Sequence, residues 1–280
     1  MEFRTRQAQD RYDGLVAVAQ DVLVGLDFDG TLSPIVEDPA QAVIHPEAPR
    51  VLTELATRVR AVAVVTGRPA RQVVELGGLE KVADGLTDGA RLVVMGQYGN
   101  ERWDSGTREF TSPEPPAGLE AFRDELPRLL AAENAQDAYV EEKGLAVAVH
   151  TRRLPDAAEA FARLEEAIAD AAERHGLTLE PGRLVLEVRA PGMHKGLAVE
   201  AALAEHHAAG VLFAGDDLGD LEAFEAVRRL RDQGLPTLLV CSGSREQEAL
   251  AELSDVVVDG PAGVLGLLSR FADDAAAAQA

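Results

Sequence analysis

The stretch that most constrains the fold is an apolar run at residues 23–26 that stops abruptly at the sequence Asp-Phe-Asp-Gly-Thr, residues 27–31. In an open parallel sheet, ligands bind outside the carboxyl ends of the strands, so Asp27 and Asp29 should stand at the mouth of such a crevice, on one face of the extended chain. Two like charges so close repel, and a divalent cation is the usual way to keep both ionised. A strand followed by an ordinary Asp-Gly turn would explain the dipeptide alone, but not the full pattern.

Five further apolar runs are separated by helical patterns, in which apolar residues recur every three or four positions. Strands that are apolar throughout and alternate with helices indicate a parallel sheet covered on both faces. We therefore predict an α/β fold with a doubly wound, Rossmann-like core. The runs lie at residues 61–65, 92–95, 211–214, 237–240 and 256–258.

The rhythm of the sequence changes between about residues 110 and 188. A Pro-rich segment at residues 112–116 marks a boundary, and the expected strands beyond it, at residues 139–143, 145–150 and 185–189, include two that alternate in polarity as in a half-exposed antiparallel sheet. We predict a small α+β cap domain at residues 110–189, inserted into a core formed by residues 1–109 and 190–280. The Ala-rich tail from Ala275 is expected to be disordered.

Composition limits the partners. Asp and Glu outnumber Lys and Arg 48 to 27, a net charge of −21, which argues against nucleic acid or an anionic membrane. The single Cys241 excludes an intramolecular disulfide and is expected to be a buried, small apolar residue. No apolar run has the length of a signal peptide or a membrane span. We expect a cytoplasmic monomer that acts on a small molecule.

Other polar residues fall where the predicted core strands end or where a helix begins. Thr66 follows the second apolar run, Asp216, Asp217 and Asp220 follow the run at residues 211–214, and Lys195 opens a helical pattern. These residue types suit phosphoryl transfer from a monoester, a reaction that needs strong electrostatic help.

The roles follow from the chemistry of each group. Asp27 is the candidate nucleophile, which would form an acyl phosphate, and Asp29 the candidate general acid and base. Mg²⁺ would bind Asp27 and Asp216, with Asp29, mainly through its backbone carbonyl, and Asp217 completing the predicted metal set. Thr66 and Lys195 would bind the phosphoryl oxygens.

Each of these residues also has an ordinary structural explanation. Thr66 could cap the following helix, and Lys195 could be an exposed helix residue, as most lysines are. Asp216 and Asp217 could be charges at a helix N-terminus, with Asp220 solvated. The coincidence of all of them with strand ends, in this order along the chain, makes the joint explanation weak.

Four segments together resemble the motifs of the haloacid dehalogenase superfamily, in its order. They are residues 27–31, Thr66-Gly67-Arg68, Lys195, and Gly215-Asp216-Asp217. Residues 96–101 are also similar to the segment that closes the third core strand of the trehalose-6-phosphate phosphatase family, and residues 141–144, 149–152 and 186–189 are similar to its cap strands. The similarity extends from about Leu15 to Phe271.

The resemblance implies a magnesium-dependent phosphatase whose cap closes over a disaccharide phosphate. The matching positions carry over as candidate substrate contacts: Gly30, Arg68, Glu101, Glu141, Lys143, Arg152 and Glu187. For Glu141 and Lys143 a solvated strand edge is a close competitor, and His150 could be a structural histidine. Where the family has Thr and Glu around the third acid of its last motif, this chain has Gly219 and Leu221.

The leading functional hypothesis is the hydrolysis of trehalose 6-phosphate to trehalose and phosphate. A related phosphatase acting on another phosphorylated disaccharide or pseudo-disaccharide is the main alternative. A phosphate-accepting signalling domain would lack the second carboxylate two residues after the first and the inserted domain. An inactive partner of a sugar-phosphate synthase would not need the complete set of acidic, Thr and Lys residues.

Overall fold

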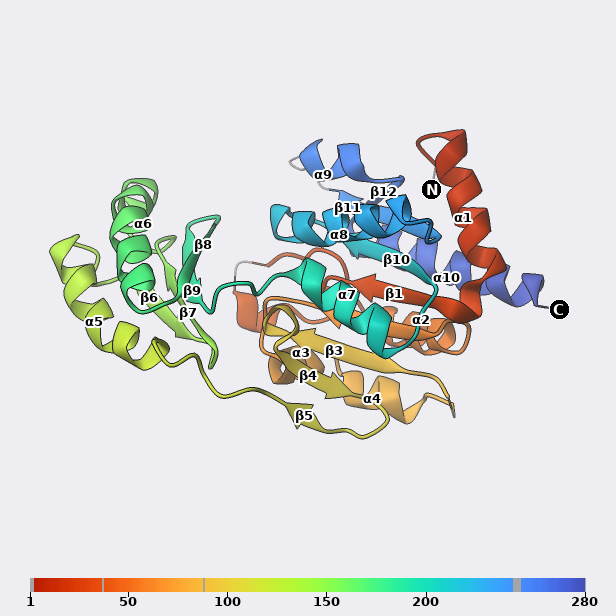
Figure 1. Ribbon diagram of the computed structural model, residues 1–280, viewed down its shortest axis with the longest axis horizontal. Helices are drawn as coiled ribbons and strands as arrows, with labels where there is room; N and C mark the ends of the chain where they lie inside the picture. Colours follow the sequence, from red (N-terminus) through yellow and green to blue (C-terminus); the bar gives the residue numbers. More distant parts are fainter. Residues whose placement is uncertain (1–2, 37, 88, 244–247, 280) are drawn as a thin grey trace. The chain divides into compact units, whose positions relative to one another are not determined.

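The computed structural model describes residues 3–36, 38–87, 89–243 and 248–279 (Figure 1). Its contacts divide the chain into two compact units. The larger consists of Met1–Ser112 and His194–Ala280, and the smaller of Pro113–Met193. The second unit is thus inserted into the first.

The larger unit is built on a sheet that has eight strands in the described part of the chain, in the order β12-β11-β10-β1-β2-β3-β4-β5. Neighbours from β12 to β3 are parallel, whereas β4 and β5 add an antiparallel edge. This confirms the predicted doubly wound sheet. The strands are β1 (Val22–Leu26), β2 (Ala61–Val65), β3 (Leu92–Gly96), β4 (Glu101–Asp104), β5 (Phe110–Thr111), β10 (Gly210–Gly215), β11 (Thr237–Gly243) and β12 (Val256–Asp259).

Helices cover both faces of this sheet because its strands are apolar on both sides. In β1, Val22, Val24 and Leu26 belong to one buried cluster and Leu23 to the other. Residues of α1, α2, α3, α4 and α10 join the first cluster, and residues of α7, α8 and α9 the second. The helices are α1 (Arg6–Ala17), α2 (Ala48–Ala56), α3 (Ala70–Leu76), α4 (Leu79–Asp84), α7 (Lys195–Glu205), α8 (Leu221–Asp232), α9 (Glu248–Leu253) and α10 (Gly260–Ala278), with 3₁₀ turns at Ala19–Asp21, Pro39–Gln41, Gln97–Gly99 and Leu218–Asp220.

The prediction that the Ala-rich tail from Ala275 is disordered was wrong. Helix α10 continues to Ala278, and Ala275 is fully buried in the first cluster. Alanine has the highest helix propensity of all residues, so an Ala-rich tail readily extends a helix that already packs against the core. Cys241 is buried, as predicted.

The smaller unit has a four-stranded antiparallel sheet in the order β6-β7-β9-β8, with two helices on one face. Alternate residues such as Val147, Val149, Leu186 and Val188 pack against the helices, and the opposite face carries the charged residues. The elements are α5 (Leu119–Ala132), β6 (Tyr139–Glu142), β7 (Ala146–His150), α6 (Ala157–Arg174), β8 (Thr178–Gly182) and β9 (Val185–Arg189).

Two details of the insertion differ from the prediction. Phe110–Thr111 was assigned to the cap but forms β5, the edge strand of the large sheet. Strand β8 was not predicted, because Pro181 and Gly182 weaken the strand signal; β8 is an edge strand, where proline is tolerated.

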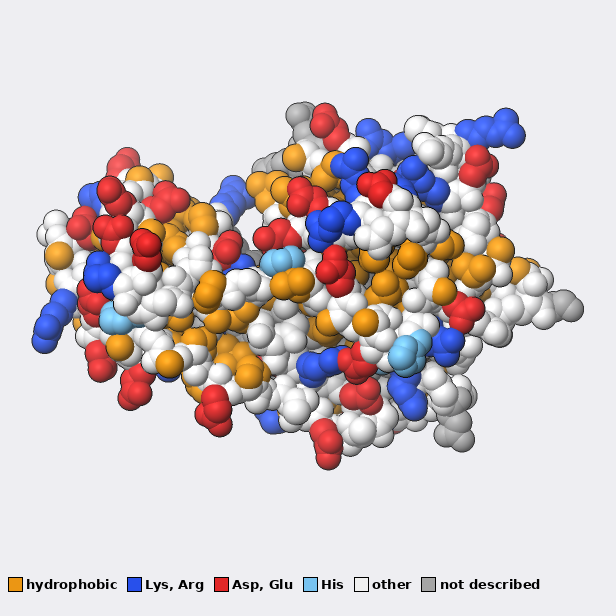
Figure 2. All heavy atoms as spheres, viewed as in Figure 1, with side chains coloured by type: hydrophobic (Ala, Val, Ile, Leu, Met, Phe, Trp, Pro, Cys, Tyr) orange, Lys and Arg blue, Asp and Glu red, His pale blue; other side chains and the backbone are white. Residues whose placement is uncertain are grey.

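The surface reflects the acidic composition. Figure 2 shows Asp and Glu side chains spread over the visible face, with Lys and Arg interspersed among them. Among the helices that the structure describes, none combines the length and the apolarity needed to cross a bilayer.

Candidate active site

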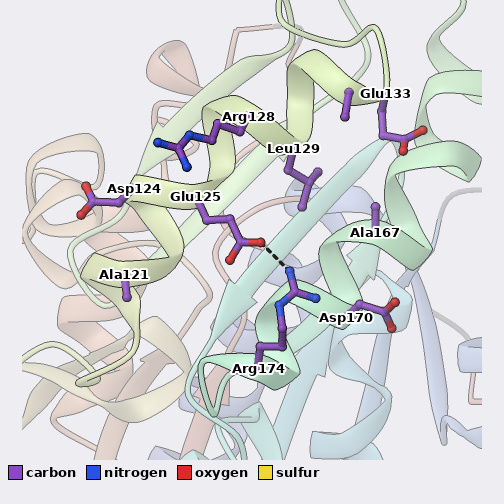
Figure 3. Close-up of a pocket in the computed structure, with 10 residues that line it drawn as sticks. Ala121, Asp124, Glu125, Arg128, Leu129, Glu133, Ala167, Asp170 and Arg174 are labelled. Carbon is purple, nitrogen blue, oxygen red and sulfur yellow. Dashed lines mark hydrogen bonds and ion pairs between the residues drawn. The ribbon is translucent and has the colours of Figure 1, made fainter.

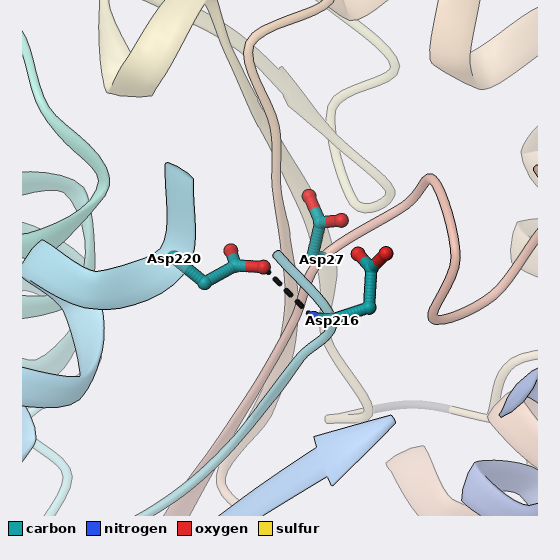
Figure 4. Close-up of side chains that lie close together, drawn as sticks. All are labelled: Asp27, Asp216 and Asp220. Carbon is teal, nitrogen blue, oxygen red and sulfur yellow. Dashed lines mark hydrogen bonds between the residues drawn. The ribbon is translucent and has the colours of Figure 1, made fainter. Parts of the chain in front are cut away.

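Two of the predicted carboxylates lie side by side at the carboxyl edge of the large sheet. Asp27 follows β1 and Asp216 follows β10, its parallel neighbour, and the Asp27 N–H donates to the Ala214 carbonyl at 2.9 Å. Together with Asp220 they form a buried cluster in which one carboxylate oxygen of each residue lies within 4.8 Å of the others (Figure 4). The strand-end argument therefore predicted correctly that these carboxylates lie together at one edge of the sheet.

Lys195 is the positive centre of this cluster. It is the first residue of α7, only 6% exposed, and its Nζ donates to Asp27 Oδ1 at 2.6 Å and to Asp220 Oδ1 at 2.7 Å. The alternative of an exposed helix lysine is therefore wrong. Lys195 also begins its helix, where the partial positive charge of the helix N-terminus adds to its own.

The cluster has three carboxylates but only one positively charged side chain, Lys195. Burial, reinforced by Asp217 and Asp220, raises the pKa of Asp216 to about 8. Burial also raises the pKa of Asp27, although the Lys195 ammonium opposes that shift. For Lys195, burial works to lower the pKa, but the Asp220 and Asp27 carboxylates outweigh it and raise the value. The ammonium therefore stays charged and the carboxylates hold protons more tightly than usual.

Asp220 is buried beside Asp216, whereas Asp217, which was predicted as part of the metal set, is not. Its Oδ2 accepts from the backbone N–H of Asp216 at 2.9 Å and of Asp217 at 3.3 Å, while Oδ1 accepts from Lys195. Asp217 is exposed, and its Oδ1 caps a 3₁₀ turn by accepting from Gly219 N–H at 2.9 Å. Asp216 and Asp220 are thus the buried acids of this segment. The alternative explanation, in which Asp220 is exposed to solvent, is wrong.

These residues fit a hard divalent cation. The oxygens of Asp220 are already acceptors of three hydrogen bonds, which leaves Asp27 and Asp216 as the carboxylates best able to bind a metal. Carboxylate and carbonyl oxygens are the ligands that Mg²⁺ prefers. A cation would also relieve the repulsion that, in addition to burial, raises the pKa of Asp216.

Gly30 brings the loop after β1 close to Asp216. Its φ is +74°, and a Cβ atom at this position would lie 2.1 Å from Asp216 Oδ2, so only glycine fits. The loop is folded back on itself by hydrogen bonds from Gly30 N–H to the Ser33 carbonyl (2.7 Å) and from Ser33 N–H to the Phe28 carbonyl (2.8 Å).

Asp29 and Arg68 form a two-point ion pair. The Arg68 Nε donates to Oδ2 of Asp29 at 2.6 Å and its NH2 to Oδ1 at 2.7 Å, while NH1 donates to the Pro39 carbonyl at 2.9 Å. Arg68 was predicted to contact substrate; in this structure its guanidinium binds the predicted acid/base residue instead.

Thr66 lies at the carboxyl end of β2 and is 1% exposed. Its Oγ1 accepts from the Arg68 N–H at 3.2 Å, which is a local turn, and helix α3 begins only at Ala70, so Thr66 does not cap that helix. Glu101 does: its Oε2 accepts from the Ala70 N–H at 2.7 Å. The structure thus gives Glu101, a predicted sugar contact, a local structural bond.

In the smaller unit, three of the predicted cap residues, Glu141, Lys143 and Glu187, gather at one face of the sheet. The register aligns Glu141, Ala148 and Glu187 across three strands, with the small alanine between the two carboxylates. Lys143 forms an ion pair with Glu187, and His150 Nε2 lies 2.9 Å from Glu141 Oε2. This charged face contrasts with the apolar face that packs on α5 and α6.

Arg152 lies apart from this ion-pair network. It follows β7 and is exposed, and its NH2 donates to the Arg183 carbonyl at the limit of hydrogen bonding, 3.5 Å.

A groove of about 750 Å³ runs between the exposed sides of α5 and α6 (Figure 3). It is lined by acidic residues such as Asp124 and Glu125, and Glu125 binds Arg174. It contains none of the residues predicted from the sequence and lies on the helical side of the smaller unit.

Known proteins are similar to this chain in sequence and in fold. A chain from Sinorhizobium fredii named "Probable trehalose-phosphate phosphatase" is 34% identical over 210 residues, 73% of each chain. The Escherichia coli trehalose-6-phosphate phosphatase is 30% identical over 233 residues, 82% of each. The C-terminal domain of the Candida albicans trehalose-6-phosphate phosphatase shares the fold with a TM-score of 0.75 at 20% identity, over 97% of this chain and 98% of that one.

The sequence model described as Trehalose-phosphatase matches residues 25–257, from within β1 to within β12. The match includes the acidic cluster, Lys195 and the whole of the inserted unit. The chain belongs to the trehalose-phosphatase family.

Proposed function

We propose that the protein hydrolyses trehalose 6-phosphate to trehalose and phosphate, with Mg²⁺, through a phosphoenzyme at Asp27. The observation that carries this proposal is the buried contact of Lys195 with Asp27, beside Asp216, at the carboxyl edge of the parallel sheet. It joins a carboxylate nucleophile, a cation and a candidate metal ligand in one place. Membership of the trehalose-phosphatase family supports the choice of substrate.

In the first step, a carboxylate oxygen of Asp27 attacks phosphorus, and the bond from phosphorus to the sugar oxygen breaks. Lys195 holds Oδ1 of Asp27, so it orients the carboxylate and is placed to offset charge on the phosphoryl oxygens. The Thr66 hydroxyl, at the end of the neighbouring strand, would donate to one of these oxygens. In the second step, water attacks phosphorus, the bond to Asp27 breaks and phosphate leaves.

Asp29 would donate a proton to the leaving sugar oxygen and then take one from the attacking water. Both of its oxygens accept hydrogen bonds from Arg68. Because the pair with Arg68 engages both carboxylate oxygens, Asp29 has to loosen it before it can carry the proton. Arg68 would then be free to bind the phosphoryl group, which would make it the substrate contact that the family resemblance implied.

Asp27 and Asp216 would hold the cation, with the Asp29 carbonyl as a third protein ligand. Among the described residues, none donates a hydrogen bond to that carbonyl. Bound Mg²⁺ would supply charge neutralisation and in-line orientation of the phosphoryl group. Asp217, exposed and engaged with Gly219, would contribute only from outside the first ring of ligands.

The charged face of the smaller unit would bind the sugar hydroxyls. Glu141 and Glu187 are two strands apart, about 10 Å, with Ala148 between them leaving room for a ring. Carboxylates accept from hydroxyls, and the Lys143 ammonium donates to them. Arg152 is a further candidate donor at the edge of this face.

The decisive test is phosphate release from a panel of sugar phosphates with and without Mg²⁺. We expect trehalose 6-phosphate to be preferred over sucrose 6-phosphate and glucose 6-phosphate, and turnover to stop when the cation is chelated. A preference for another phosphorylated disaccharide would replace the proposed substrate while leaving the chemistry at Asp27 intact. Turnover that persists in chelator would contradict the metal requirement.

A further inference from the structure

Ser242 is a buried serine at the carboxyl end of β11, a strand to which the sequence assigned no functional residue. Gly215 pairs with Cys241 in the register of β10 and β11, so the next residues along the two strands, Asp216 and Ser242, are neighbours at the sheet edge. Ser242 is 2% exposed. The serine therefore lies beside the acidic cluster without belonging to it.

The Ser242 hydroxyl donates a hydrogen bond of 2.6 Å to the carbonyl oxygen of Gly30, in the loop after β1. The N–H of the same glycine donates to the Ser33 carbonyl at 2.7 Å. Both backbone polar groups of Gly30 are therefore hydrogen-bonded. Its N–H is bonded within the loop, and its carbonyl is bonded to β11, which lies two strands from β1 in the sheet.

The position of Gly30 matters because its backbone touches Asp216. The Cα of Gly30 is so close to the Asp216 carboxylate that an added Cβ would lie 2.1 Å from Oδ2. Gly30 also follows Asp29, whose carbonyl is a proposed metal ligand. A displacement of the Gly30 peptide would therefore move two proposed ligands relative to each other.

We infer that Ser242 is a positioning residue for the metal site: its hydroxyl fixes the Gly30 peptide, and with it the spacing between the Asp29 carbonyl and the Asp216 carboxylate. This inference rests on the magnesium site proposed above. Outer groups that orient ligands commonly change metal affinity when they are removed. If Ser242 only satisfied a buried carbonyl, its loss would lower stability and leave the affinity for Mg²⁺ unchanged.

The test is calorimetric titration of the substrate-free protein with Mg²⁺. We expect Ser242→Ala to weaken Mg²⁺ binding by roughly tenfold, and Ser242→Thr, which keeps the hydroxyl, to restore most of it. In turnover, Ser242→Ala should raise the Mg²⁺ concentration needed for half-maximal rate more than it lowers the rate at saturation.

Ser254→Ala is the matched control. Ser254 is 8% exposed, and its Oγ donates to the Ala251 carbonyl at 2.8 Å, a bond of the same kind outside the acidic cluster. We expect this variant to lose stability without any change in Mg²⁺ affinity.

Equal Mg²⁺ affinities in Ser242→Ala and the natural protein would overturn the inference. If the alanine variant does not fold, Ser242→Cys keeps the shape with a weaker donor, and an unchanged affinity in that variant is equally decisive. The substrate panel is independent of these titrations. A protein that rejects trehalose 6-phosphate but loses Mg²⁺ affinity in Ser242→Ala would refute the proposed substrate and support the role of Ser242.

Discussion

The guanidinium of Arg68 donates two hydrogen bonds to the Asp29 carboxylate, from Nε to Oδ2 at 2.6 Å and from NH2 to Oδ1 at 2.7 Å. Arg68 is the more buried partner, with 13% of its side chain exposed against 39% for Asp29. Its NH1 is anchored to the Pro39 carbonyl. The arginine is thus fixed by the loop before α2, and Asp29, the proposed acid and base, is fixed by the arginine.

Removal of Arg68 should misplace Asp29. We expect Arg68→Ala to lower kcat by roughly 10- to 100-fold, and Arg68→Lys to recover little, because an ammonium cannot bind both carboxylate oxygens in a planar fork. Arg71→Ala, in which the lost guanidinium packs on Phe110, serves as control and should leave kcat unchanged. Steady-state kinetics checks this, and an unaltered kcat in Arg68→Ala would show that the ion pair has no part in turnover.

Substitution of the two acids should separate their roles. Asp27→Asn should abolish turnover and phosphoenzyme formation together, because the nucleophile is gone. Asp29→Asn should slow both steps by roughly 100-fold or more, yet bind Mg²⁺ nearly as well, since its proposed contact is through the backbone. Acid-quench trapping with labelled substrate and calorimetry distinguish these outcomes. Label retained on the Asp27→Asn protein would refute the covalent step.

Magnesium binding should depend on pH through Asp216. Its pKa is raised to about 8, so in the metal-free protein at neutral pH this carboxyl holds a proton that a cation must displace. The affinity for Mg²⁺ should therefore increase with pH, by roughly fivefold between pH 7 and pH 8, and level off above that value. Calorimetry in buffers of different ionisation enthalpy would detect the released proton; affinity that is flat over this range would contradict the assignment.

The raised pKa of Asp216 also determines how the free energy of unfolding changes with pH. The folded-state pKa of Asp216 lies above its usual value of 3.8, so folding is favoured at low pH and loses this contribution as pH rises through about 8. Saturating Mg²⁺ should restore it. Denaturant unfolding at several pH values, with and without Mg²⁺, measures the effect.

On the inserted unit, Glu187→Gln should raise KM for trehalose 6-phosphate with little change in kcat, because the proposed contact of Glu187 is to the sugar and not to the phosphoryl group. Hydrolysis of p-nitrophenyl phosphate, which has no sugar, should be unaffected. Glu166→Gln, an exposed change in α6, is the control for charge alone. Equal losses on both substrates would show that Glu187 supports the fold rather than the sugar.

Sequence reasoning located the acidic cluster because one rule suffices for it: parallel strands end at the same edge, and Asp27 and Asp216 each follow such a strand. It could not choose between Asp217 and Asp220, since both lie in the same short segment. That choice is made by the turn after β10, which directs Asp220 inward to Lys195 and leaves Asp217 in solvent.

Contacts between segments far apart in sequence were beyond prediction for another reason. Arg68 and Glu101 carry no local signal that their side chains bind Asp29 and the start of α3, because these bonds depend on how loops from different strands meet. Ser242 is the extreme case, since it follows a buried cysteine in an ordinary apolar run. Strand β5 was missed because two residues on the outer edge of a sheet have almost no pattern to detect.

The three buried carboxylates of the cluster, when ionised, carry three negative charges, and Lys195 supplies one positive charge. The remainder equals the charge of one divalent cation with opposite sign. Without the cation, the raised pKa of Asp216 leaves a proton on this carboxyl at neutral pH, so the empty site limits its negative charge by holding protons. A single Mg²⁺ would displace such protons and balance the three ionised carboxylates and Lys195 instead. Binding of the proposed cation would therefore leave the Asp27 carboxylate ionised and ready to attack, so we expect metal to bind before substrate.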